Sequence, residues 1–129
     1  VDFDTLQAVI ANRYDVLSRY AKSLKQVYRE ELDRLQDGNR FKGLKRWLAA
    51  DAGAVPQEMR GRLESLLGES RALETAYAMR QELAAVWERS NASREQLLQA
   101  LQDWCERAEN SGVRQLQELS MRLRSYALA

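Results

Sequence analysis

The stretch that decides the fold runs from residue 4 to residue 36 and reads DTLQAVIANRYDVLSRYAKSLKQVYREELDRLQ. Its apolar residues recur at helical spacing: Ile10, Leu17 and Leu24 are seven residues apart. After Leu24 the apolar row shifts by four residues and continues through Tyr28, Leu32 and Leu35. Such a stripe is typical of an amphipathic α-helix, and the shift resembles a coiled-coil stutter. We therefore predict one long helix from about Asp4 to Gln36, with Asp4 as its N-cap and Gln7 as the capping-box partner.

The length of this helix predicts a partner for its apolar stripe. At 1.5 Å per residue it would be about 45–50 Å long, more than a small globule covers. The stripe would therefore pack on later helices, on a second copy of the chain through self-association, or on the catalytic domain of a larger parent protein.

Turn and cap signals divide the rest of the chain into five shorter helices. Asp37, Gly38 and Asn39 form the first turn signal, and Asn110, Ser111 and Gly112 form the last. The predicted helices are Arg40 to Ala50, Pro56 to about Gly68, one capped by Ser70, one with a capping box of Ser93 and Gln96, and a last one that carries Leu116 to Tyr126. The fold class is therefore all-α, a bundle of about five to six helices. We expect residues 1–129 to form a single domain. Because the sequence begins at Val1 without an initiator Met, we also expect it to be a fragment of a longer chain.

Composition excludes several kinds of site. The chain has no histidine, which removes Ser-His-Asp and Cys-His catalysis, most zinc sites and every histidine-rich iron site. Cys105, the one cysteine, lies on an apolar helix face and is predicted to be a small buried hydrophobe. Trp47, Trp87 and Trp104 also lie on apolar faces and are predicted to be core residues. We predict no catalytic, metal or cofactor-binding residue in this chain. A net charge of +1 means that no overall electrostatic field attracts nucleic acid or an anionic membrane. The single cysteine excludes an intrachain disulfide framework, and with no signal peptide this favours a cytoplasmic location.

One segment suggests a binding surface. Residues 40–47 read RFKGLKRW, four cations and two aromatics in eight positions. Arg40, Lys42, Lys45 and Arg46 are therefore candidates for contact with anionic lipid headgroups or with nucleic-acid phosphates. The simpler interpretation, which we prefer, is an amphipathic helix with Leu44, Trp47 and Leu48 inward and its cations in water.

Scattered positions along nearly the whole chain carry a resemblance. They are Asp4, Thr5, Asn12, Arg13, Leu66, Leu67, Ala72, Leu73, Tyr77, Arg80, Leu83, Trp87, Leu97, Leu98, Trp104, Ala108, Glu109, Ser111, Gly112, Leu116, Gln117, Glu118, Leu123 and Tyr126. The pattern resembles the C-terminal extension of bacterial membrane-bound fatty acid desaturases. The resemblance implies a di-iron oxidoreductase parent in the inner membrane, with the iron held by histidine boxes that this chain lacks. This chain would then be a non-catalytic cytoplasmic tail that acts in docking, dimerisation or partner binding.

A second family competes with the first. The stretch from Leu44 to Tyr126 is similar to a helical region of bacterial insertion-sequence transposases, where such an alternation precedes the last acidic catalytic residue. That similarity omits the first 40 residues, and Asp4 to Tyr20 fits the desaturase tail better, so we prefer the desaturase. Nucleic acid becomes a partner under the transposase alternative. In that case further catalytic carboxylates would lie outside this chain, because metal-assisted strand transfer uses carboxylates from separate elements.

Overall fold

The structure is a computed structural model that describes residues 3–36, 41–88 and 92–126. Over these residues it contains helices and no strands: α1 (Phe3–Ala11), α2 (Arg13–Leu35), α3 (Lys45–Leu48), the 3-10 helix η1 (Ala52–Ala54), α4 (Gln57–Glu69), α5 (Arg71–Trp87), α6 (Arg94–Glu109) and α7 (Arg114–Arg124). The predicted all-α bundle is confirmed. Seven α-helices are described instead of five to six, because the first predicted helix is two helices.

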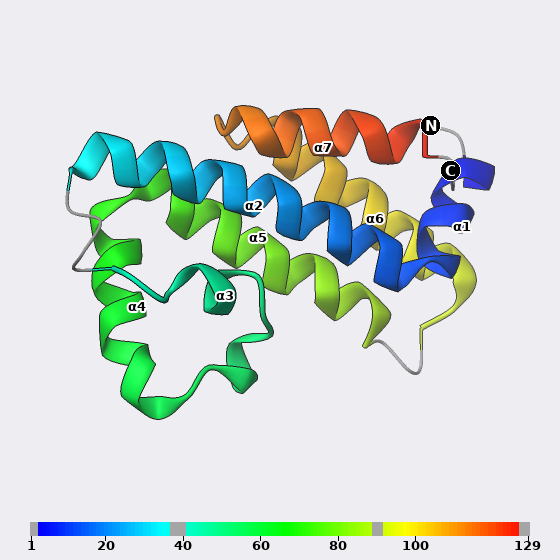
Figure 1. Ribbon diagram of the computed structural model, residues 1–129. Coiled ribbons are helices and arrows are strands. Elements are labelled where there is room, and N and C mark those ends of the chain that lie inside the picture. The colour runs from blue at the N-terminus through cyan, green and yellow to red at the C-terminus, as the bar shows by residue number, and fades with distance from the viewer. Residues whose placement is uncertain (1–2, 37–40, 89–91, 127–129) are drawn as a thin grey trace.

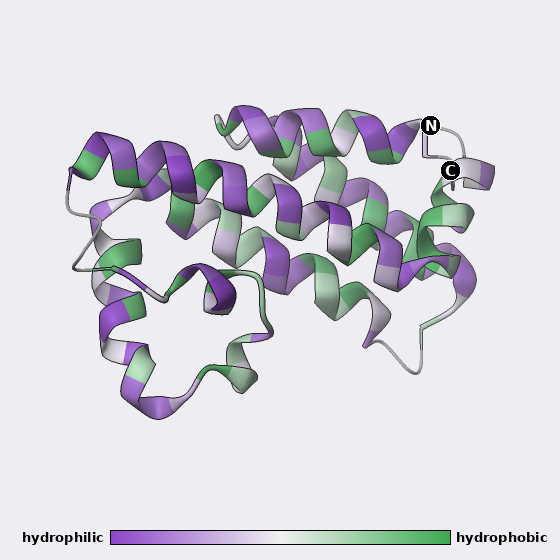
Figure 2. Ribbon diagram, in the orientation of Figure 1, coloured by the Kyte–Doolittle hydropathy of each residue, from purple (hydrophilic) through white to green (hydrophobic). Residues whose placement is uncertain are grey.

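The bundle is built around α2, which packs against α5 and α7, while α6 packs against both of these (Figure 1). Helix α1 folds over one end of the bundle onto α6 and α7, and α3 lies against α2. Tyr20, Leu24, Leu83, Leu101 and Trp104 are among the side chains that these helices bury between them. Figure 2 shows hydrophilic residues interspersed along the helices. None of the described helices combines the length and hydropathy that crossing a bilayer requires.

The prediction of one continuous helix from Asp4 to Gln36 is wrong at a single residue. Asn12 takes φ −126° and ψ 50°, outside the helical range, and separates α1 from α2. Its side-chain amide Nδ2 donates to the Ala8 carbonyl at 2.7 Å, and its backbone N–H donates to the Val9 carbonyl at 3.1 Å. Asn competes with helix in this way because its short amide bonds neighbouring backbone groups. The predicted start is also wrong: α1 begins at Phe3, so Asp4 lies inside its first turn and is not its N-cap.

Because of this break, the apolar stripe is no longer too long for the other helices to cover. Because α1 turns back, Leu6 and Val9 are buried against α6 and α7. Of the predicted stripe, Leu24 and Tyr28 are buried in the same core, while Ile10, Leu17, Leu32 and Leu35 are partly buried against it. The row that is buried along α2 also includes Val16, Tyr20 and Val27, which the predicted stripe left out. The stripe therefore packs on later helices, the first of the three partners considered. Self-association remains a prediction, but the stripe no longer requires it.

The helix predicted from Arg40 to Ala50 is much shorter in the structure. Arg40 lies outside the described residues, as do Asp37, Gly38 and Asn39; residues 41–43 form a turn, and α3 has four residues. Gly43 has φ +87°, a left-handed conformation that ends any helix begun before it. The turn is held by Tyr28, whose hydroxyl donates to the Phe41 carbonyl at 3.0 Å. Local propensity favours helix here, and this tertiary contact overrides it.

The remaining boundary predictions are confirmed to within one or two residues. Ser70 caps α5 by accepting from the Leu73 N–H at 3.1 Å, and Ser93 and Gln96 form the predicted capping box of α6. Gly112 takes φ +76° between α6 and α7. Pro56 is the N-cap of α4, one position before the predicted one. Trp104 is buried, whereas Trp47 and Trp87 are partly buried against the core.

Candidate functional site

The outer face of α2 carries a row of exposed cations. Lys22, Lys25 and Arg29 are spaced at i, i+3 and i+7, so they lie on one side of the helix. The opposite side buries Tyr20 and Val27. No ion pair is found for these three cations among the described residues. Within the described part of the chain, their charges therefore face solvent without a carboxylate partner.

The predicted basic segment lies on the neighbouring element. Lys42 and Arg46 are exposed and Lys45 is half-buried. The Arg46 guanidinium stacks over the Trp47 ring, 4.6 Å from its centroid. Leu44 and Leu48 are buried, as the amphipathic interpretation requires. Because α3 packs against α2, we treat the cations of both elements as one basic surface: Lys22, Lys25, Arg29, Lys42, Lys45 and Arg46.

The net charge of +1 does not reveal that cations are concentrated on this surface. Residues 16–29 and 41–50 together contain seven cations and no carboxylate, in a chain whose overall charge is +1. Elsewhere carboxylates and cations neutralise one another, and the pairs include Glu30–Arg114, Glu82–Arg107, Glu88–Arg13, Glu109–Arg124 and Asp51–Arg80. A surface of one sign of charge attracts anionic partners even when the whole molecule is nearly neutral.

A groove borders the basic surface between α2 and α5. It has a volume of about 610 Å³ and is lined by Arg13, Tyr14, Leu17, Ser18, Ala49 and Arg80. Arg80 is buried, and its Nη1 donates to Asp51 Oδ1 at 2.6 Å. Arg13 Nη2 lies 3.1 Å from Glu88 Oε1. The groove thus combines two guanidinium groups with an exposed aromatic ring.

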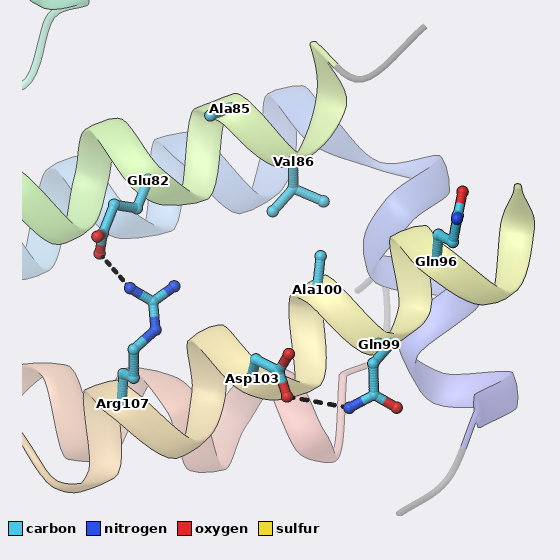
Figure 3. Close-up of a pocket in the computed structure, with 8 residues that line it drawn as sticks. All are labelled: Glu82, Ala85, Val86, Gln96, Gln99, Ala100, Asp103 and Arg107. Atoms are coloured by element: carbon cyan, nitrogen blue, oxygen red, sulfur yellow. Dashed lines mark hydrogen bonds and ion pairs between the residues drawn. The ribbon is translucent and has the colours of Figure 1, made fainter. Parts of the chain in front are cut away.

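A second groove, between α5 and α6, has a volume of about 560 Å³ and a different character (Figure 3). Val86 on α5 and Ala100 on α6 point toward each other across it. Four of its charged and polar groups are already paired within the groove: Glu82 Oε2 lies 2.8 Å from Arg107 Nη1, and Gln99 donates to Asp103 at 2.9 Å. Nothing in this lining favours one class of ligand.

Cys105 is buried as predicted. Burial raises the pKa of its thiol, although the Ser120 side chain acts in the opposite direction. A buried thiol with a raised pKa is a weak nucleophile. Cys105 therefore contributes to packing between α6 and α7.

The comparisons with known proteins identify the family. A family model described as "Transposase", of the ISL3 type of DDE transposases, matches residues 6–128. The chain belongs to this transposase family. No curated protein and no solved structure matches it.

This finding corrects the desaturase assignment. The resemblance to a desaturase extension is wrong, and the family match supports the transposase alternative. The match also begins at residue 6, so it includes the first helices, which we had placed outside the transposase similarity. The positions that suggested a desaturase are mostly Leu, Ala, Trp and Tyr at helical spacing. Any amphipathic helical bundle shares that spacing, so it does not distinguish one family from another.

Transposases of the DDE class imply divalent metal ions, so the fit of the described residues to such ions matters. Metal-assisted strand transfer needs clustered carboxylate oxygens. Across residues 3–36, 41–88 and 92–126, no group of three or more Cys, Asp or Glu side chains is placed to hold an ion. Glu30, Asp51 and Glu109 instead face arginines. The described residues therefore do not form such a metal site by themselves.

Sequence reasoning found one half of the basic surface and missed the other. Lys42, Lys45 and Arg46 stand close together in the sequence, and that density drew attention to them. Lys22, Lys25 and Arg29 are spread over two turns of helix. The signal that could have found them is the absence of any Asp or Glu from residue 16 to residue 29 in a chain that is 30% charged.

Proposed function

We propose that this chain is a helical part of a transposase that holds DNA by its phosphate backbone, through the basic surface. The observation that carries the proposal is the segregation of Lys22, Lys25, Arg29, Lys42, Lys45 and Arg46 onto two adjoining elements. Membership of a transposase family supports DNA as the anionic partner. DNA as the partner is compatible with the cytoplasmic location expected from the sequence, which is part of this proposal.

The chemistry of the surface favours backbone contact over base reading. Lysine is a flexible point charge, and four of the six cations are lysines. Phosphate contacts of this kind position a protein on the duplex without specifying its sequence. Each phosphate that is neutralised releases condensed counterions, which lowers the logarithm of affinity by about 0.9 per unit of log salt concentration. The proposal therefore predicts affinity that depends steeply on salt and weakly on sequence.

The test compares two triple substitutions that change the net charge equally. Lys22→Gln, Lys25→Gln and Arg29→Gln remove the α2 part of the basic surface. Arg71→Gln, Arg94→Gln and Arg122→Gln remove three exposed cations elsewhere and serve as the control. Binding of a fluorescent duplex is measured by anisotropy across a salt series. We expect the first triple to weaken binding and to reduce the salt slope by about 1 per cation, and the control to change both much less.

Two outcomes would contradict the proposal. One is equal weakening by both triples, because binding would then follow net charge and not this surface. The other is stronger binding to anionic lipid vesicles than to DNA at the same salt concentration, because the surface would then be a membrane contact. The triple Lys42→Gln, Lys45→Gln and Arg46→Gln tests the α3 half in the same way.

A further inference from the structure

We infer that the groove between α2 and α5 seats one nucleotide of a DNA strand, with its phosphate at Arg13 and Arg80 and its base against Tyr14. This inference rests on the proposed function and adds a specific subsite to it. The groove opens beside the α2 face of the basic surface, since Tyr14 and Ser18 precede Lys22 and Lys25 on that helix.

Arg80 is the more deeply buried of the two groove arginines. Its side chain is 9% exposed, which is unusual for a charged group, yet it lines an open groove. A guanidinium has five N–H donors in a fork that fits phosphate oxygens. One of these donors, on Nη1, is used by Asp51. Arg80 therefore presents a positive charge that the protein has desolvated and held in place in advance.

Asp51 marks the position that an anion takes in this groove. Its carboxylate is 63% exposed and comes from the segment before η1, not from the body of the bundle. The hydrogen bond and charge of Arg80 lower the pKa of Asp51, and the charge of Arg13 lowers it further. Arg80 therefore binds this anionic position directly, and Arg13, which lines the same groove and also pairs with Glu88 at 3.1 Å, adds a second positive charge near it. A phosphate that brings more charge and more acceptor oxygens competes with an exposed carboxylate for that position.

Tyr14 supplies the second half of the subsite. Its side chain is 90% exposed, and it is one of two large hydrophobic residues, with Met121, that are highly exposed in the described part of the chain. It stands at the rim of the groove, beside Leu17 and Ala49. An exposed ring next to guanidinium groups is the arrangement on which unpaired bases stack while their phosphates are held. The groove volume of about 610 Å³ lies in the range of small-ligand sites.

The first experiment uses inorganic phosphate as the probe, so it contains no DNA. Chemical shifts of the Arg80 Nε–H and the Ser18 amide are followed by NMR as phosphate replaces chloride at constant ionic strength. We expect saturable shifts in the wild-type chain. Asp51→Asn should lower the half-saturating concentration about fivefold, the upper end of what one exposed ion pair contributes. Glu106→Gln, an equal charge change on the exposed side of α6, should leave it unchanged.

The second experiment compares a single-stranded oligonucleotide with a duplex of the same sequence. Tyr14→Ala should weaken single-strand binding and leave duplex binding nearly unchanged, whereas Tyr14→Phe should retain both, because the ring is kept. Since Tyr14 is exposed, these variants test the subsite even if Asp51→Asn unfolds the chain.

The results separate the two proposals. The groove inference is overturned if Asp51→Asn behaves like Glu106→Gln toward phosphate, or if Tyr14→Ala weakens both DNA forms equally. If either result occurs while the triple of Lys22, Lys25 and Arg29 still loses duplex binding, only the groove inference fails. The proposed function then remains intact. Unchanged duplex binding in that triple overturns the proposed function itself, and with it the DNA strand as the occupant of the groove.

Discussion

At the scale of single residues, two aromatic side chains join three helices. Trp104 on α6 and Tyr20 on α2 are both fully buried, with ring centroids 6.0 Å apart. Each uses its polar atom to bond the backbone of α5: Trp104 Nε1 donates to the Met79 carbonyl at 2.8 Å, and the Tyr20 hydroxyl donates to the Ala76 carbonyl at 2.7 Å. Large apolar area and a satisfied polar tip make such residues efficient at fixing one packing arrangement.

Replacing Tyr20 with Phe isolates the hydrogen bond from the packing. The ring remains, while the hydroxyl that reaches Ala76 is lost. We expect Tyr20→Phe to lower the free energy of unfolding by about 0.5–1.5 kcal/mol, and Trp104→Ala to lower it by about 3–5 kcal/mol. Urea unfolding followed by circular dichroism measures both. Equal losses of unfolding free energy in the two variants would contradict this expectation, because one hydroxyl would then contribute as much as the whole Trp104 side chain.

At the scale of elements, side chains and backbone groups at the helix ends define the boundaries. Ser70 and Ser93 bond the first free N–H groups of α5 and α6, so these two starts were predictable from the sequence. Gln36 ends α2 in a left-handed conformation, with its N–H donating to the Leu32 carbonyl, and nothing in its side chain signals this. Asn12 breaks the first helix although its neighbours continue the apolar pattern.

Two glycines give a matched test of these local rules. Gly112 has φ +76°, so a side chain there is strained, whereas Gly61 lies inside α4 with open space around an added Cβ. We expect Gly112→Ala to destabilise the chain by about 1 kcal/mol or more, because Ala tolerates this conformation poorly. Gly61→Ala should stabilise it by about 0.5–1 kcal/mol, because Ala is the better helix former. Thermal unfolding of both variants checks the opposite signs, and a loss of stability in Gly61→Ala would contradict the assignment of α4.

At the scale of the whole molecule, ion pairs between elements tie the stability of the bundle to pH. Glu109 on α6 bonds Arg124 and Ser120 on α7, and Asp51 bonds Arg80 on α5. The hydrogen bond from Arg124 lowers the pKa of Glu109, as that from Arg80 lowers the pKa of Asp51. A carboxyl with a lowered folded-state pKa adds stability above its unfolded pKa of about 4, and loses it as pH falls through the folded value.

We therefore expect the free energy of unfolding to fall as pH is lowered from about 5 toward 3. Glu109→Gln should be less stable than the wild type at neutral pH, and its stability should depend less on pH in the acid range. The two curves should approach each other at the acid end, because the wild-type carboxyl is then protonated. Urea unfolding at several pH values measures this, with Glu106→Gln as the control. Parallel curves for wild type and Glu109→Gln would contradict the role given to the Arg124 contact.

The sequence by itself determined the fold class, most helix boundaries and the burial of Cys105 and Trp104. These follow from the spacing of apolar residues and from cap residues, which act within a few positions of the chain. It named the cations of the α3 half of the basic surface as candidates, because they are close together in sequence, although the preferred interpretation was a solvated helix face. It did not predict the α2 half.

The tertiary structure decided the rest, because the deciding contacts join residues far apart in the chain. The turn at Phe41 depends on Tyr28, and the return of α1 depends on the surfaces that α6 and α7 offer to Leu6 and Val9. The groove depends on Arg80 reaching Asp51 beside Arg13 and Tyr14, which sequence spacing does not indicate. The bundle as a whole places these arginines on one side of α2, beside the cations of the basic surface.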